Sequence, residues 1–436
     1  MPTQESTGPK APRETAWGAA VRICARWLDR RERIDLLMDS LPADLPAPER
    51  ARCQHLFYGV VRHFGRIEAA VMRHIAHPPR FPTRAILHVA GFELVEAQLA
   101  GESGSLAAKI VHHAVDRAKE LTSAPEARLV NAVARRAAET IAAQAPPGAV
   151  ASAASLSEYF SHPEWLVQRW LPEFGAAPVR KLLEWNQTPA PVHARWRGPA
   201  GGAPAWLVPT AHAGFYGVPP GRWPEVAVLL EAGLIYLQDP GTRLSVELLA
   251  PGRGEAVLDL CASPGGKSLM IADAMQEGRL VAVDLPDSRI DRLKENLSRL
   301  RGVEAALVQG DVVAGLPAIL AEHRLPRLYD AILVDVPCSN TGVMRHRVDV
   351  KWRLEREDFA KHGRQQSRLL GAAAQLLAPG GRLVYSTCSI DRAENEEVVQ
   401  AFVRRNQGFR IEKSAVAVPW IEGHDGAAAF LLRRAP

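Results

Sequence analysis

Two cysteines at the ends of predicted strands are the residues of this sequence best suited to covalent chemistry. Cys338 follows the apolar strand-like run 330–334 and the carboxylate of Asp335, and Cys388 follows the strand-like segment 382–386. A cysteine thiolate is a strong nucleophile, and a neighbouring acid or base can move the substrate's protons. For either cysteine alone, an inert buried thiol is the simpler interpretation. Composition by itself does not show which of the two thiols is the nucleophile.

The remaining cysteines carry no such signal. Cys24 and Cys53 are expected to be small buried hydrophobes. No Cys-x-x-Cys pair occurs among the five cysteines, so we expect neither a disulfide framework nor a zinc site, and no other metal site is predicted. No apolar run approaches the length of a membrane span, and the N-terminus has no signal-peptide core. We therefore expect a cytoplasmic protein that does not enter a membrane.

A glycine-containing loop lies between a short apolar run, residues 256–260, and a predicted helix, residues 267–276. Two glycines let the backbone approach a ligand, and the helix N-terminus offers unpaired N–H groups. A P-loop would need glycine where Cys261 stands, and Gly-x-Gly-x-x-Gly is absent, so nucleoside triphosphates and dinucleotides are disfavoured. The predicted cofactor-binding residues of the loop are Cys261, Ala262, Ser263, Pro264, Gly265, Gly266 and Lys267.

Three carboxylates follow successive predicted strands. Asp284 ends the second strand, where an acid can accept hydrogen bonds from ribose hydroxyls. Asp311 follows the third strand and suits an adenine amino group, and Asp335 ends the fourth. A single aspartate there is more often a turn or cap residue. The three together favour a nucleoside cofactor without phosphates, for which S-adenosylmethionine qualifies.

The elements that must position these residues form an α/β pattern. From about Val246, strands alternate with helices, which predicts a doubly wound, Rossmann-like parallel sheet. The expected strands cover residues 256–260, 279–284, 306–309, 330–334 and 382–386. The intervening helices are expected at residues 267–276, 288–300 and 357–377.

The N-terminal third reads as helices with apolar residues at three- and four-residue spacing. The predicted helices cover residues 17–37, 51–75, 83–99, 107–121 and 125–143. We expect a disordered lead at residues 1–14 and an all-α bundle at 15–145. A linker with a small α+β connecting domain at 146–236 and a catalytic domain at 237–436 follow.

The chain has a formal net charge of +5, which mildly favours an anionic partner. Arg345, Arg347 and Lys351 follow Cys338 and are candidate phosphate ligands. A solvated basic loop is nearly as good an interpretation.

Several motifs resemble those of the RNA 5-methylcytosine methyltransferases. They are the run 259–267, Asp335-Val-Pro-Cys338, Asp349-Val-Lys-Trp352 and Thr387-Cys388, in this order. In the helical third, Phe57-Tyr-Gly-Val-Val-Arg62 and Leu129-Val-Asn-Ala-Val-Ala-Arg135 resemble the NusB-like domain of the bacterial 16S ribosomal RNA methyltransferase B family. The chain departs from the family pattern at Ser263, Val336, Asn340 and Val348.

The resemblance implies roles that the residues alone leave open. In this family the Thr-Cys cysteine attacks C6 of cytosine and the Pro-Cys cysteine helps to release the product, which assigns Cys388 as nucleophile and Cys338 as release partner. Asp335 would bind protonated N3 of the base, and Lys267 would orient the base. The implied cofactor is S-adenosylmethionine, and the implied partner is 16S ribosomal RNA, bound by a monomer.

Two alternative functions remain. A tRNA cytosine-5 methyltransferase shares the catalytic motifs but usually lacks a NusB-like domain. An RNA-binding ribosome assembly factor with weak or no catalysis would need the helical domain alone. The presence of Cys338, Cys388 and all three carboxylates speaks against this second alternative.

Overall fold

The computed structural model describes residues 14–102 and 104–435, so the predicted disordered lead lies, apart from Glu14, outside the described residues. Contacts divide the chain into two compact units, residues 1–187 with 351–353, and residues 188–350 with 354–436. The expected connecting domain is therefore split between the two units at residue 187. Within the described part of the chain, no helix is long and apolar enough to span a membrane.

The first unit is helical. Its helices are α1 (Ala16–Arg30), α2 (Ile34–Asp39), α3 (Ala47–Arg62), α4 (Phe64–Met72), α5 (Phe81–Leu99), α6 (Gly104–Leu121), α7 (Ala124–Ala143), α8 (Ala153–Tyr159), α9 (Glu164–Phe174) and α10 (Ala176–Asn186). Local signals set the helix starts: the Thr15 hydroxyl accepts a hydrogen bond from the Gly18 N–H, and Ser123 and Glu126 form a capping box at α7. Large side chains such as Trp27 and Phe57 are fully buried in this unit.

Two predicted helices are each two helices in the structure. The predicted helix 17–37 breaks at Arg31, whose backbone adopts a left-handed conformation (φ 51°) and donates its N–H to the Trp27 carbonyl. The predicted helix 51–75 breaks at His63, between α3 and α4. Apolar periodicity continues across both breaks, which is why the sequence pattern did not reveal them.

The second unit contains two sheets. The smaller sheet has strand order β2-β3-β1-β4 and is accompanied by α11. The bounds are β1 (His193–Trp196), β2 (Val208–Pro209), β3 (Phe215–Gly217), α11 (Trp223–Glu231) and β4 (Ile235–Leu237). Ala194, Leu207, Val226 and Ile235 form its core.

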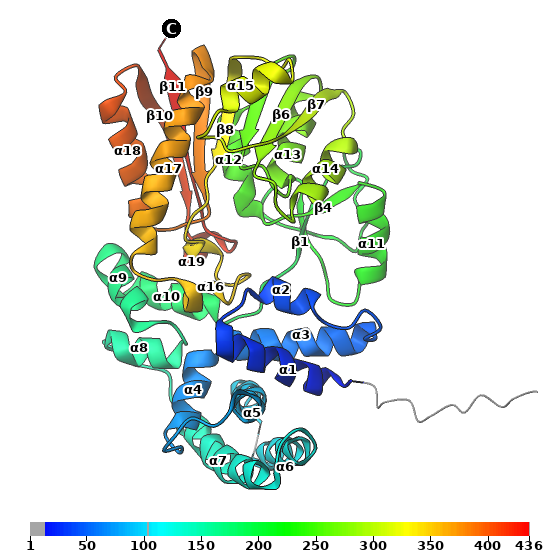
Figure 1. Ribbon diagram of the computed structural model, residues 1–436, viewed down its shortest axis with the longest axis vertical. Coiled ribbons are helices and arrows are strands. Elements are labelled where there is room, and N and C mark those ends of the chain that lie inside the picture. Colours follow the sequence, from blue (N-terminus) through cyan, green and yellow to red (C-terminus); the bar gives the residue numbers. More distant parts are fainter. Residues whose placement is uncertain (1–13, 103, 436) are drawn as a thin grey trace, which may run out of the picture. The chain divides into compact units, whose positions relative to one another are not determined.

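The larger sheet carries the candidate site (Figure 1). Its strand order is β10-β11-β9-β8-β5-β6-β7, and β5 to β9 are parallel. These strands are β5 (Ala256–Leu260), β6 (Gly278–Asp284), β7 (Val303–Gln309), β8 (Tyr329–Asp335) and β9 (Leu377–Thr387). The predicted parallel α/β sheet is confirmed, and each of its five strands overlaps a predicted one.

Helices cover both faces of this sheet, because successive strand residues point to opposite sides. In β5, Leu258 and Leu260 belong to one core and Val257 to the other. The first core includes side chains of α15 (Leu316–Glu322), α17 (Asp358–Gln375) and α18 (Glu396–Arg405). The second includes side chains of α12 (Arg243–Leu249), α13 (Gly266–Met275) and α14 (Ile290–Ser298).

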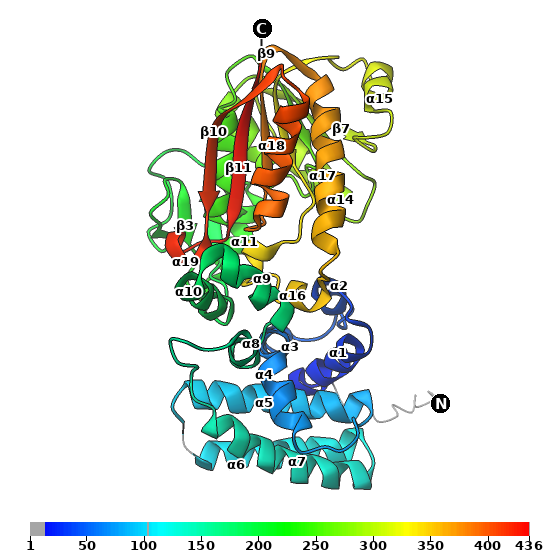
Figure 2. The same ribbon diagram turned by 90° about the vertical axis from the view of Figure 1, so that its left-hand side faces the viewer.

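One edge of the sheet is completed by two antiparallel strands (Figure 2). The sequence pattern did not predict either of them. They are β10 (Phe409–Ala417) and β11 (Ala427–Arg434), and β11 pairs antiparallel with β9. The short helix α19 (Pro419–Glu422) lies between them in the chain. The run Ala427-Ala-Ala begins β11 with residues that favour helices, so local propensity conflicts with the tertiary pairing that decides the strand.

Candidate active site

The site lies where the sheet reverses its strand order. The chain proceeds from β5 outward to β6 and β7 and then returns to β8 on the other side of β5. Ligands of open α/β sheets bind at such a switch point, at the carboxyl ends of the strands. The loop after β5 holds residues 261–266, and the loop after β8 holds Cys338.

The cofactor loop needs its glycines. Gly265 has φ 103°, a conformation that residues with a side chain rarely adopt. A Cβ on Gly266 would lie 2.9 Å from the Tyr236 ring and 3.1 Å from the amide of Gln238. Cys261 is the first residue of the loop. Burial, and to a smaller extent the charge of Asp284, raises the pKa of its thiol, so Cys261 is not a nucleophile at neutral pH.

The predicted ribose carboxylate supports this loop directly. Asp284 accepts hydrogen bonds from the backbone N–H of Ser263 (2.7 Å) and of Leu285 (2.7 Å). Asp311 lies two residues beyond Gln309, the last residue of the neighbouring strand β7, and Gln309 pairs with Asp284. The Asp311 carboxylate accepts a hydrogen bond from the Val313 N–H at 2.8 Å. The structure therefore places both carboxylates at one edge of the sheet.

Asp259 is a buried acid of this site that the sequence interpretation did not single out. One carboxylate oxygen accepts from the Ser268 hydroxyl at 2.6 Å, and the other has no hydrogen-bond partner among the described residues. Burial, and next the charge of Asp335, raises its pKa to about 7, although the Ser268 hydrogen bond opposes the shift. Its position at the end of an apolar run, directly before the loop, was the available signal.

We expect Asp259 to make the ligand-free chain less stable as the pH rises. The unfolded carboxyl has a pKa near 4, so between about pH 4 and pH 7 the folded chain retains a proton that the unfolded chain has lost. Stability therefore falls across this window, by at most about 4 kcal/mol. Asp259→Asn should flatten the pH dependence and unfold at higher temperature than wild type at pH 8, measured by calorimetry.

Asp311→Asn is the matched control, because Asp311 is exposed and its side chain accepts a local turn hydrogen bond. It should keep the wild-type pH profile. Parallel profiles for wild type and Asp259→Asn would contradict the prediction.

The two catalytic cysteine candidates meet at neighbouring strand ends. Asp335 of β8 pairs with Ser386 of β9, and this register brings Cys338 and Cys388 together, with 3.3 Å between their Sγ atoms. Asn340 contacts both: its Nδ2 donates to the Cys338 carbonyl at 2.8 Å, and its Oδ1 accepts from the Cys388 thiol at 3.2 Å. Asn340 has φ 59°, which asparagine tolerates well.

A charged pair stands beside the thiols. The Lys267 ammonium lies 2.5 Å from a carboxylate oxygen of Asp335, which also accepts from the Ser386 hydroxyl at 2.6 Å. Burial lowers the pKa of Lys267, but the Asp335 carboxylate outweighs this and the pKa is raised. The lysine therefore stays charged at neutral pH and can hold an anion or a carbonyl oxygen.

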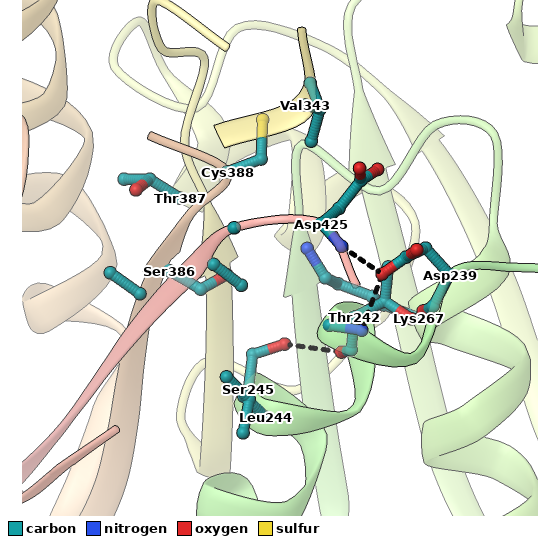
Figure 3. A pocket seen from close by; sticks show the side chains of 14 residues that line it. Asp239, Thr242, Leu244, Ser245, Lys267, Val343, Ser386, Thr387, Cys388 and Asp425 are labelled. Carbon is teal, nitrogen blue, oxygen red and sulfur yellow. Dashed lines mark hydrogen bonds between the residues drawn. The ribbon is translucent and has the colours of Figure 1, made fainter. Parts of the chain in front are cut away.

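Several of these groups line a cavity of about 370 Å³, including its open mouth, where a ligand could reach them (Figure 3). Lys267 of α13 and Ser386 of β9 line it together with Cys388, which directly follows β9, and Asp239 and Asp425 line it from two other loops. The sequence interpretation predicted Cys388 and Lys267 as site residues but neither Asp239 nor Asp425.

Asp239 and Asp425 form a cluster with His346. One ligand atom from each of the three lies within 4.8 Å of the others, a donor set that a cation could use. His346 Nδ1, however, lies 2.9 Å from the Asp425 carboxylate, and although burial opposes it, this carboxylate raises the pKa of His346. His346 and Asp425 therefore form an ion pair, and we assign no metal to the cluster.

A buried polar network ties the loop after β8 to the loop after β9. The carboxylate of Glu394, which is fully buried, accepts from the backbone N–H of Ser339 (2.9 Å) and from the Gln366 amide (3.2 Å). The Thr341 hydroxyl donates to Asp391 at 2.8 Å. None of these residues was predicted from the sequence. Small polar residues directly after each cysteine were the available signal.

The three candidate phosphate ligands have different surroundings. Arg347 is exposed, while Arg345 donates to the carbonyl of Pro189 at 3.1 Å. Lys351 is only 1% exposed, and its ammonium donates to the Arg62 carbonyl within the first unit at 2.9 Å. The prediction that Lys351 contacts RNA phosphate is therefore corrected. Its nearness in sequence to Arg347 concealed that residues 351–353 pack into the helical unit.

Comparisons with known proteins agree with this geometry. The model of the family described as 16S rRNA methyltransferase RsmB/F matches residues 246–426, and the NusB family model matches residues 11–139. Ribosomal RNA small subunit methyltransferase B of Salmonella arizonae is 30% identical over 403 residues, covering 88% of this chain and 89% of that protein. The Vibrio cholerae protein of the same name is 30% identical over 412 residues, covering 88% of each chain.

Solved structures share the fold. The crystal structure of PH0851 superposes with a TM-score of 0.74 at 21% identity, over 98% of this chain and all of that one. The structure of NSun6 from Pyrococcus horikoshii with SFG has a TM-score of 0.50 at 19% identity and covers 63% of this chain and 98% of that one. The predicted combination of a helical NusB-like part and a Rossmann-like methyltransferase part is confirmed.

Proposed function

Because the chain belongs to the 16S rRNA methyltransferase RsmB/F family, we propose that it methylates C5 of a cytosine in 16S ribosomal RNA through a covalent bond between Cys388 and C6. Membership of this family makes the chain an S-adenosylmethionine-dependent ribosomal RNA methyltransferase. The proposal adds the target atom, the choice of 16S RNA and the role of each side chain.

The residues around the cofactor loop fit S-adenosylmethionine. One oxygen of Asp259 and the hydroxyl of Ser263 are buried without a partner among the described residues, as expected where a polar ligand binds. Asp284 and Asp311 supply carboxylates for hydroxyl and amino groups, and negative charge so close to the loop disfavours a ligand that carries phosphates. When bound, S-adenosylmethionine supplies an electrophilic methyl group.

The single observation that carries the mechanism is the meeting of two thiols and the Lys267–Asp335 pair at one cavity. C5 of cytosine is a weak nucleophile, and addition of the Cys388 thiolate to C6 makes C5 electron-rich. Asp335 accepts a hydrogen bond from protonated N3 of the base, and Lys267 stabilises the negative charge that develops on the ring. After C5 has taken up the methyl group, its proton passes to a base or to water in the cavity, the bond from C6 to Cys388 breaks with the sulfur leaving as a thiolate, and the aromatic ring is restored.

The target cytosine must be unpaired or flipped out of a helix to enter the cavity. The function is tested by incubating the chain with 16S RNA, small-subunit particles and tRNA in the presence of methyl-labelled S-adenosylmethionine, followed by bisulfite mapping. We expect 5-methylcytosine at one position of 16S RNA. Label in tRNA alone would favour the tRNA alternative, and no label in any RNA would favour an assembly factor.

RNA binding is expected to depend steeply on salt, with affinity falling at least about tenfold between 50 and 200 mM salt, because phosphate contacts release counterions. Arg347→Ala should weaken binding and reduce the slope of log affinity against log salt by about one. Filter binding at several salt concentrations measures both quantities.

Arg253→Ala is the matched control, because Arg253 precedes β5 and therefore lies at the amino end of that strand, away from the site at the carboxyl ends. Its side chain pairs with Glu277 at 2.7 Å. It should leave the slope unchanged. An equal change in slope for both variants would show that Arg347 has no special contact with RNA.

A further inference from the structure

The closeness of the two active-site thiols has a chemical consequence beyond methyl transfer. The Sγ atoms of Cys338 and Cys388 are 3.3 Å apart and both cysteines are unpaired thiols. A disulfide would require them to move only about 1.3 Å closer. Among the described residues, neither of these thiols forms a hydrogen bond with any of the other three cysteines.

The fold holds the two loops at this separation. The Gly342 N–H donates to the Cys388 carbonyl at 3.0 Å, and a Cβ on Gly342 would lie 2.7 Å from that oxygen. Glu394 accepts from the Ser339 N–H, next to Cys338, and Asn340 contacts both cysteines. These interactions hold the two thiols adjacent.

The two thiols differ in their access to solvent. Cys388 lines the open cavity and is partly exposed, whereas Cys338 is 7% exposed. A small oxidant entering the cavity therefore meets Cys388 first. Cys338 is more deeply buried, and its sulfur is close enough to that of Cys388 to act as a resolving thiol.

We propose that Cys338 and Cys388 form a reversible disulfide when the chain meets a hydroperoxide, and that this bond switches the active site off. The Cys388 thiolate attacks the terminal peroxide oxygen, forming a sulfenic acid and releasing an alcohol or water. The Cys338 sulfur then attacks the Cys388 sulfur, the S–O bond breaks, and water leaves. Two electrons pass from the thiols to the peroxide, and a dithiol reductant reverses the reaction.

The loss of activity rests on the proposed roles of both cysteines, but bond formation does not. The test treats the full-length chain with hydrogen peroxide and measures intact mass, free thiols and linked peptides. We expect a mass loss of about 2 Da, two fewer titratable thiols, and a peptide pair that joins Cys338 to Cys388. Dithiothreitol should restore both the thiols and methyl transfer.

Variants separate this pair from the other thiols. Cys338→Ser should stop at the sulfenic acid of Cys388, which dimedone traps, and Cys53→Ser should behave as wild type. A sulfinic acid on Cys388 beside a free Cys338, or linkage to Cys261, would overturn the inference. Disulfide formation in a chain without methyltransferase activity would count against the proposed function and leave this inference intact.

Discussion

Cys388→Ala is expected to abolish methyl transfer, with a loss of at least about a thousandfold in turnover, or about 4 kcal/mol of transition-state stabilisation. Without a thiolate adding to C6, C5 of cytosine has too little electron density to accept a methyl group at a useful rate. The loss should appear in turnover rather than in cofactor affinity, because the cofactor loop follows another strand, β5. Steady-state assays and calorimetric titration with S-adenosylmethionine measure the two quantities.

Cys53→Ala is the matched control, since Cys53 is fully buried in the helical unit and has no part in the mechanism. It should retain wild-type turnover. RNA containing 5-fluorocytidine, which cannot lose a proton from C5, should trap wild type but not Cys388→Ala as a covalent complex. Measurable methylation by Cys388→Ala would contradict the assignment of the nucleophile.

Cys338→Ala is expected to accumulate a covalent protein–RNA adduct and to fall to about one turnover per enzyme molecule. The contact with Cys388, together with burial, raises the pKa of Cys338 well above its ordinary value, so it remains a thiol. Its S–H can therefore donate a hydrogen bond to the Cys388 sulfur, 3.3 Å away, as that sulfur leaves C6. Alanine removes this donor, and release of the product slows.

Denaturing electrophoresis detects the adduct, and peptide mapping identifies the attached residue. Cys338→Ser keeps a small hydrogen-bond donor at the same position and should release product faster than Cys338→Ala. An adduct through Cys338 in the Cys388→Ala variant would reverse the two roles. Absence of an adduct in both Cys338 variants would exclude a role for Cys338 in release.

Much of the catalytic fold could be predicted because its strands are short apolar runs separated by helices and glycine turns. The strand at residues 256–260 was predicted with the bounds that the structure has. The strands β10 and β11 could not be predicted in this way. β10 is largely exposed and β11 begins with three alanines, so neither has the alternating pattern of a half-buried strand.

The candidate site was predicted unevenly for a related reason. Asp284, Asp335 and both cysteines lie at or just after strand ends, and parallel strands deliver such residues to one edge. Lys267 lies in the first turn of the helix that follows the glycine loop. Lys351 was misplaced, because nearness in sequence to the site does not decide which unit a side chain packs into. Asp259 and Glu394 were missed, since the sequence does not show that either carboxylate is buried.

The sequence by itself determined which reactive groups exist and which strand each one follows. The order and spacing of the motifs around Lys267, Cys338 and Cys388 were sufficient to identify the family and its cofactor. The tertiary structure alone decided that β8 and β9 are neighbours, with Asp335 opposite Ser386. That register depends on strand pairing and packing over fifty residues of chain, and it is what places the two sulfur atoms 3.3 Å apart.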